Sequence, residues 1–224
     1  MFRQDYIIRM IEQFGQVLRQ IVGLNKAGNF EDARNVIAST TEELVGFNLE
    51  EVCATADAKL VSKLIKGQTP PEARERCFML VTLLTEAGDN FAGLEQLDKR
   101  RACLLKALNL HLAIGSFADE EVVPDYAPKL DRLIDLAKEE GLPARSLIGL
   151  MQFHESHGQY GKAEDRLFEL IEAIDQKKPA LDLGVAFFHR LLAKPEEILE
   201  SGGLPRAEVE QGLAELDRIH VESA

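Results

Sequence analysis

The sequence has few or none of several residue types that mark particular protein classes. Tryptophan is absent, and only three cysteines and eight prolines occur in 224 residues. The cysteines form no C-x-x-C pair, so they do not indicate a zinc or thioredoxin-like site. We expect Cys53, Cys77 and Cys103 to be reduced thiols, with Cys77 and Cys103 in the hydrophobic core. Without a recognisable export signal, this usage favours the cytoplasm.

Long apolar runs and an excess of basic residues are also missing. No stretch approaches 18 consecutive apolar residues, so no membrane-spanning helix is expected. The formal net charge is −12 at pH 7, and charges of both signs are interspersed along the chain. An acidic chain repels nucleic acids and anionic lipids, so such partners are not expected. Phosphate-binding loops and Ser-His-Asp patterns are absent, and no cofactor is predicted.

The sequence does contain hydrophobic spacing that is typical of helices. Apolar residues recur every three or four positions, and no alternating pattern of useful length indicates a strand. This spacing predicts an all-α fold with about ten helices and roughly 70% helical residues. We expect the helices at about residues 4–26, 33–44, 57–66, 70–88, 91–114, 125–140, 143–157, 161–175, 179–193 and 205–220.

Glycine and proline mark the expected ends of these helices. Gly46, Gly67 and Gly88 follow apolar segments and predict that a helix ends there. The clearest start is Thr69, which offers an N-cap hydroxyl and is followed by two prolines. Glu72 stands three residues after Thr69, as in a capping box.

One short phrase occurs twice. Residues 28–33 and 158–163 both read Gly-x-aromatic-x-x-Ala. In such a turn the glycine ends one helix, the aromatic ring fills the corner, and the small alanine lets the next helix pack closely. Each phrase therefore predicts a turn between two antiparallel helices, with Ala33 and Ala163 buried.

These phrases and the helices around them resemble tetratricopeptide repeats. In that family, antiparallel helix pairs of about 34 residues stack into a right-handed superhelix. The residues that match the repeat pattern are Phe30, Ala33, Ile37, Leu150, Tyr160, Ala163, Leu167 and Leu170. The segments 46–67 and 115–124 interrupt the repeat length. The chain also resembles uncharacterised helical families of bacteria, a resemblance that implies no activity.

The resemblance implies a tetratricopeptide-like superhelix of stacked antiparallel helix pairs with an irregular middle. We expect a single domain over residues 1–224, with a possible sub-boundary near residues 115–124.

A basic island on one predicted helix is the best candidate for binding an anionic group. Guanidinium groups match the geometry of carboxylates and phosphates, so the island is a candidate rim contact for an acidic partner. The alternative is pairing within the chain, because Glu95 and Asp98 lie within helical reach. The island consists of Lys99, Arg100, Arg101 and, further along, Lys106.

His154 and His157 are the best candidates for metal ligands. Two histidines three positions apart on a helix share a face, and neutral imidazoles bind zinc. The spacing is not that of H-E-x-x-H, and no third ligand is apparent. The alternative is structural: His154 occupies a packing position of the repeat, and His157 stands at a helix carboxyl end, where a cation is favoured. We expect no bound metal there.

Three functions remain open at this point. The preferred hypothesis is a non-enzymatic scaffold that binds a protein or peptide in an apolar groove, with homodimerisation also possible. The second is a helical sensor domain that binds a small molecule between helices. The third is a metal-dependent enzyme that uses His154 and His157.

Overall fold

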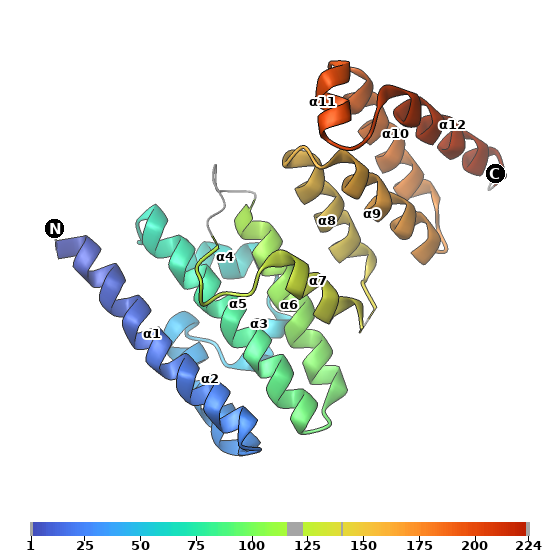
Figure 1. Cartoon of the computed structure of the whole chain (residues 1–224). Coiled ribbons are helices and arrows are strands. Elements are labelled where there is room, and N and C mark those ends of the chain that lie inside the picture. Colours follow the sequence, from blue (N-terminus) through green and yellow to red (C-terminus); the bar gives the residue numbers. More distant parts are fainter. Residues whose placement is uncertain (1, 116–122, 140, 223–224) are drawn as a thin grey trace. The chain divides into compact units, whose positions relative to one another are not determined.

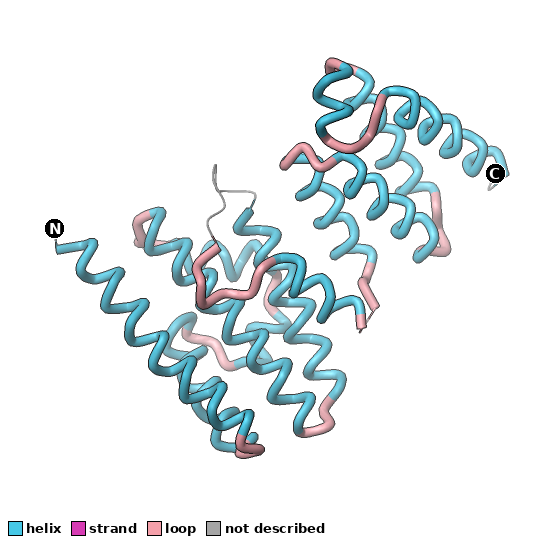
Figure 2. Tube along the Cα trace, viewed as in Figure 1, coloured by secondary structure: helices cyan, strands magenta, loops and turns pink. Residues whose placement is uncertain are grey.

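The structure, a computed structural model, describes residues 2–115, 123–139 and 141–222 (Figure 1). Within these ranges the chain forms twelve helices and no strand, as Figure 2 shows. The predicted all-α class is therefore confirmed. The chain divides into two compact units, Met1–Gly141 and Leu142–Ala224. The single domain and the right-handed superhelix stay predictions.

The first unit is built around one long helix. Its described helices are α1 (Phe2–Lys26), α2 (Phe30–Val45), α3 (Leu49–Ala54), α4 (Asp57–Ile65), α5 (Pro70–Gly93), α6 (Leu97–Gly115) and α7 (Leu130–Lys138). Helix α5 packs against α1, α2, α4 and α6. Every residue from Cys77 to Thr85 is buried, so this part of α5 has no solvent-exposed face. A helix covered on all sides forms the centre of its unit.

The sequence predicted the start of α5 correctly but not its end. At the start, the Glu72 carboxylate accepts hydrogen bonds from the Thr69 backbone N–H and hydroxyl, each at 2.8 Å. The predicted end at Gly88 is wrong, because α5 continues to Gly93. A β carbon at Gly88 would lie 2.8 Å from Leu104 Cδ2. Gly88 therefore permits close packing of α6 and does not end the helix, and α6 begins later than predicted.

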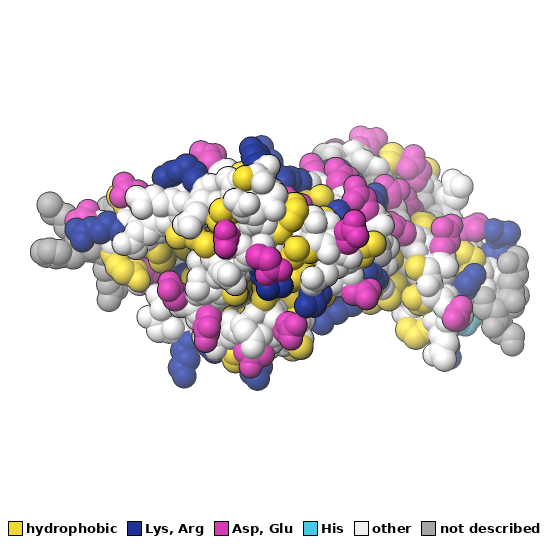
Figure 3. Space-filling model, turned by 90° about the horizontal axis from the view of Figure 1, so that it is seen from below, with side chains coloured by type: hydrophobic (Ala, Val, Ile, Leu, Met, Phe, Trp, Pro, Cys, Tyr) yellow, Lys and Arg dark blue, Asp and Glu magenta, His cyan; other side chains and the backbone are white. Residues whose placement is uncertain are grey.

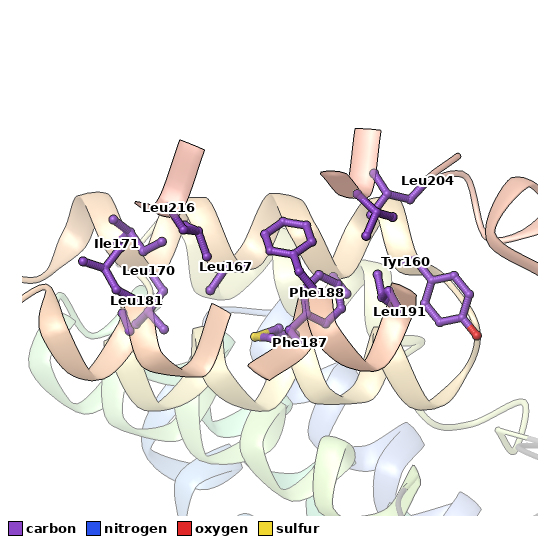
Figure 4. Packing of buried hydrophobic residues seen from close by; sticks show 14 of the residues in the cluster. Tyr160, Leu167, Leu170, Ile171, Leu181, Phe187, Phe188, Leu191, Leu204 and Leu216 are labelled. Carbon is purple, nitrogen blue, oxygen red and sulfur yellow. The ribbon is translucent and has the colours of Figure 1, made fainter. Parts of the chain in front are cut away.

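The second unit contains amphipathic helices around one core. Its described helices are α8 (Ala144–Ser156), α9 (Tyr160–Ala173), α10 (Lys178–Leu192), α11 (Glu196–Ser201) and α12 (Arg206–Glu222). Helix α9 packs against α8 and α10, and α10 packs against α12. Figure 4 shows the cluster of buried side chains that they share, which includes Tyr160, Leu167, Phe187, Phe188, Leu191 and Leu216.

The two repeated phrases fold in the same way. Gly28 and Gly158 have φ angles of 76° and 69°, a region that glycine adopts without steric cost. Ala33 and Ala163 are both 0% exposed, as predicted. In each turn the glycine N–H donates to the carbonyl three residues earlier, and the next N–H donates to the carbonyl five residues earlier. The pairs are Gly28 to Asn25, Asn29 to Leu24, Gly158 to Glu155 and Gln159 to His154.

Two short helices, α3 and α11, were not predicted. Each has six residues, too few for a periodic apolar pattern. The start of α3 nevertheless has a local signal, a capping box formed by Asn48 and Glu51. The Asn48 side chain accepts from the Glu51 N–H, and the Glu51 carboxylate accepts from the Asn48 N–H, each at 2.9 Å. Most of the predicted loop at residues 115–124 lies outside the described residues.

Candidate functional site

A groove of about 600 Å³ opens on the first unit. Its walls come from α2, α3, α6 and the carboxyl end of α5, and we refer to it as the α3 groove. Most of its lining is apolar or small: Ala38, Leu49, Cys53, Ala54, Phe91, Ala102 and Cys103. The polar lining residues are Arg34, Asn35, Asn48, Glu50 and Lys99. Concave, mainly apolar surfaces with a few polar groups are typical binding sites.

The buried side chain of Lys106 joins two walls of this groove. Its ammonium group donates to the Thr55 carbonyl at 2.6 Å and to the Asp57 carboxylate at 2.8 Å. The side chains of Lys106 and Asp57 are 9% and 8% exposed, so each charge is compensated inside the protein, as burial requires. The interaction ties the segment after α3 to α6 and thereby keeps the carboxyl end of α3 beside α6.

Two thiols, Cys53 from α3 and Cys103 from α6, meet in the lining of the groove. Their Sγ atoms are 3.7 Å apart, and neither is in a disulfide. The hydrogen bond with Cys103, aided by the Lys106 charge, lowers the pKa of Cys53, although burial opposes this shift. The same hydrogen bond and burial raise the pKa of Cys103. Burial raises the pKa of the third cysteine, Cys77 of α5, to about 12.

Charged side chains stand at the edge of the groove. The Lys99 ammonium lies 3.7 Å from the Glu50 carboxylate and 5.6 Å from the centre of the Phe91 ring. Arg34 forms an ion pair with Glu31 one helical turn away on α2. These ion pairs are solvent-exposed, so each is expected to contribute only about 0–1 kcal/mol. Their cations therefore remain accessible to an anionic group of a ligand.

The predicted basic island does not form one surface. Lys99 lines the α3 groove, whereas Arg100 donates to the Glu139 carboxylate at 2.9 Å. Arg101 donates to the Gly141 carbonyl at 3.4 Å. Lys106 is buried against Asp57. The ion pairs described for the island thus involve acids of α3, α4 and the end of α7, brought close by packing. A role in partner binding stays a prediction.

His154 and His157 have structural contacts. His154 is 5% exposed, and its Nδ1 is hydrogen-bonded to the Gln159 side-chain oxygen at 2.8 Å. His157 Nδ1 lies 2.8 Å from the Phe153 carbonyl oxygen, and its ring stacks on Phe153 with 4.0 Å between ring centres. Within the described residues, no group of three or more His, Cys, Asp or Glu is placed to hold a metal ion.

The charges on the molecular surface are mixed. On the face that Figure 3 draws, basic and acidic side chains are interspersed with apolar ones, as the sequence indicated. Among the residues that the structure describes, no helix combines the length and apolarity needed to cross a membrane.

Comparison with known proteins assigns a family but no activity. Residues 1–220 match the model of the Family of unknown function (DUF6483), and the chain belongs to that family. The predicted membership of an uncharacterised family is thereby confirmed, whereas the tetratricopeptide relationship stays a prediction. No curated protein and no solved structure matches the chain.

Proposed function

We propose that this member of the DUF6483 family is a non-enzymatic interaction module that holds a peptide segment of a protein partner in the α3 groove. The observation that carries the proposal is the groove itself, with its volume of about 600 Å³ and its mainly apolar lining. This space accommodates a few partner side chains, and peptide grooves commonly bind through such apolar anchors.

The partner segment should combine an apolar anchor with a neighbouring carboxylate. Leu49 and Phe91 provide the apolar contact, and Lys99 stands beside them. The Lys99 and Glu50 side chains are 50% and 84% exposed, and exposed pairs of this kind are weak. A partner carboxylate can therefore replace Glu50 at little cost. Burial of the anchor supplies the affinity, and Lys99 supplies the preference for an acidic neighbour.

The chemistry of the lining supports a binding role over a catalytic one. Among the described residues, neither histidine nor aspartate lines the groove, and the one carboxylate in its lining, Glu50, pairs with Lys99. Acid–base catalysis requires a group positioned beside the substrate with a pKa near the working pH. The two thiols are the other reactive groups in the lining. We place the interaction in the cytoplasm, where such thiols stay reduced.

A small molecule is the second candidate occupant. The groove volume lies within the range of about 300–1,000 Å³ that is usual for small-ligand sites. A second copy of this chain is a less favoured partner, because a net charge of −12 opposes self-association at low salt.

Filling the groove tests the proposal. Ala102 is exposed and lines the groove, so Ala102→Trp should block it without disturbing the core. Ala186→Trp is the matched control, because Ala186 is exposed in the middle of α10. The tagged full-length protein is purified gently, and native mass spectrometry identifies what remains bound to each variant.

The proposal expects a co-purified polypeptide that Ala102→Trp loses and Ala186→Trp retains. A bound mass of small-molecule size with the same pattern would support the second candidate instead. Equal retention by both variants would contradict a role for the α3 groove.

A further inference from the structure

Two thiols from distant parts of the sequence meet in the α3 groove. Cys53 and Cys103 are 50 residues apart in sequence, on two helices, yet their Sγ atoms are 3.7 Å apart. Both belong to the lining of the groove, so small reagents in solvent have a path to them. Cys53 is half-buried, whereas Cys103 is 1% exposed. Cys53 is therefore the more accessible of the two thiols.

We propose that Cys53 and Cys103 form a modification site at which a hydroperoxide converts the two thiols into an intramolecular disulfide. This inference goes beyond the interaction role and does not depend on it, because the reaction needs no partner protein. The oxidant is a hydroperoxide, ROOH, where R is hydrogen or an organic group.

The reaction balances in two steps. In the first, the Cys53 thiolate attacks the peroxide oxygen; an S–O bond forms, the O–O bond breaks, and ROH leaves after taking up a proton. In the second, the Cys103 sulfur attacks the sulfur of the Cys53 sulfenic acid; an S–S bond forms, the S–O bond breaks, and the hydroxide leaves as water with the Cys103 proton. The two thiols lose two electrons in total, and the peroxide gains them.

The surroundings favour Cys53 as the sulfur that attacks first. It is the more accessible thiol, and the hydrogen bond from Cys103 stabilises its thiolate. The Lys106 charge acts in the same direction, whereas burial and the Glu50 charge oppose it. Lys99 is the cation that acts on Cys103. Thiolates are the reactive form of cysteine, so Cys53 should react and Cys103 should resolve the product.

The geometry requires only a small closure. The sulfurs must approach from 3.7 Å to about 2.05 Å. Cys53 belongs to a helix of six residues, α3, which can shift more easily than the long helix α6 that carries Cys103. The disulfide would link α3 to α6 within the groove.

Cys77 is the internal control in the same chain. It is buried in α5 and does not belong to the lining residues given for the groove. Burial raises its pKa to about 12. The reduced full-length protein is treated with a small excess of hydrogen peroxide, denatured and alkylated with iodoacetamide. Intact mass and peptide mapping then locate each thiol.

We expect one alkylated cysteine, Cys77, in place of three, and a peptide that joins Cys53 to Cys103 within one chain. Cys77 should react with hydrogen peroxide at least tenfold more slowly than Cys53. Three alkylated thiols, a link between two chains, or Cys53 sulfinic acid beside an unreacted Cys103 would each overturn the proposal. Because these measurements use the unaltered protein, they decide the question even if a variant fails to fold.

Variants test the order of the steps. Cys103→Ser should leave a Cys53 sulfenic acid that dimedone traps. Cys53→Ser should slow peroxide consumption at the pair by tenfold or more. Cys77→Ser is the matched control and should form the disulfide at the unaltered rate. Equal rates for Cys53→Ser and Cys77→Ser would contradict the assignment of Cys53 as the attacking sulfur.

Discussion

In both units the aromatic residue of the repeated turn packs on a glycine from another helix end. A β carbon at Gly93, the last residue of α5, would lie 2.3 Å from the Phe30 ring. A β carbon at Gly202, after α11, would lie 2.2 Å from the Tyr160 ring. The corner that the aromatic fills is therefore completed by a distant segment, which must present a glycine there.

The two units attach that distant segment by different means. In the first unit, the Asn90 side chain donates to the Phe30 carbonyl and to the Asn25 side chain, each at 2.8 Å. In the second, the Gly161 backbone N–H donates to the Gly202 carbonyl at 3.1 Å. The same turn can thus be held by a side chain or by backbone alone, and what packs on it differs accordingly.

The surfaces of the two units also differ. In the first, α3 inserts after α2 and creates an apolar groove with two thiols. In the second, a hollow beside α9 and α12 is lined by acids that include Glu164, Glu208 and Glu215. A shared turn therefore predicts how helices pair, but the surface depends on the segments inserted between the pairs.

The largest effect is expected from a substitution that disturbs the backbone attachment at the turn of the second unit. A β carbon at Gly202 would lie 2.5 Å from the Gly158 carbonyl oxygen, besides its overlap with Tyr160. Gly202→Ala should therefore destabilise the second unit by about 3 kcal/mol, since backbone cannot move aside as a side chain can. Urea unfolding with hydrogen exchange in α9 and α11 measures this.

Gly23→Ala is the matched control in the first unit. A β carbon at Gly23 meets nothing within 4 Å, and the residue lies inside α1. Replacing it should stabilise the protein by about 0.5–1 kcal/mol, because alanine favours helix over glycine. Equal effects of the two substitutions would show that the contacts at Gly202 do not matter.

The second prediction compares the two alanines of the repeated turn. Ala33 and Ala163 are both 0% exposed at the joint between two helices. Ala33→Leu and Ala163→Leu should each cost about 1–3 kcal/mol through overpacking. Thermal unfolding monitored by circular dichroism measures both. An unchanged melting temperature for either variant would contradict close packing at that joint.

The third prediction concerns the acidic hollow of the second unit. Burial, with the charges of Glu208 and Asp165, raises the pKa of Glu164 from 4.5 to about 7. Between about pH 4.5 and pH 7, the Glu164 carboxyl group therefore holds a proton in the folded state that it releases in the unfolded state. The resulting stability is complete below about pH 4.5 and is lost as the pH rises through about 7.

Glu164→Gln should remove this dependence. It should raise the free energy of unfolding at pH 8 by about 1 kcal/mol, a figure reduced for the partial solvent exposure of the group. Unfolding from pH 5 to pH 8, with Glu210→Gln as an exposed control on α12, measures the change. A stability increase that is independent of pH would contradict the assignment to Glu164.

The smallest effect compares one backbone position in the two units. The turns after α5 and after α11 share a hydrogen-bond pattern, in which Glu95 and Gly203 take equivalent places with φ of 59° and 75°. A side chain is strained there, so Glu95→Gly should stabilise the protein by about 0.5 kcal/mol after the entropy cost of glycine. Gly203→Ala should destabilise it by about 1 kcal/mol. The midpoints of urea unfolding measure both changes in stability. A loss of stability with Glu95→Gly would mean that other contacts of Glu95 outweigh the strain.

The order of these helices and most of their ends were predictable because their signals are local. Apolar spacing, the capping box at Thr69 and the turn glycines Gly28 and Gly158 each act within a few residues of chain. The same reasoning was wrong at Gly88. A glycine needed for close helix packing and a glycine that ends a helix look alike until the partner, Leu104, is known.

The candidate site was less predictable. Lys99 was singled out for its charge, and it does line the α3 groove, but its companion Lys106 proved to be buried with Asp57. Cys103 was correctly placed in the core, yet nothing in the sequence connected it to Cys53. The helix that carries Cys53 was itself missed, although Asn48 and Glu51 formed a readable start.

Local signals were enough to predict that this protein is helical, where its main helices lie, and that two similar turns join helix pairs. These properties follow from propensity and periodicity, which operate between residues one to five positions apart. No local signal showed that Cys53 meets Cys103 or that Phe30 packs on Gly93; these contacts arise from tertiary packing. Such contacts join residues 50 or more positions apart, and the choice among them depends on how whole helix faces fit together in the core.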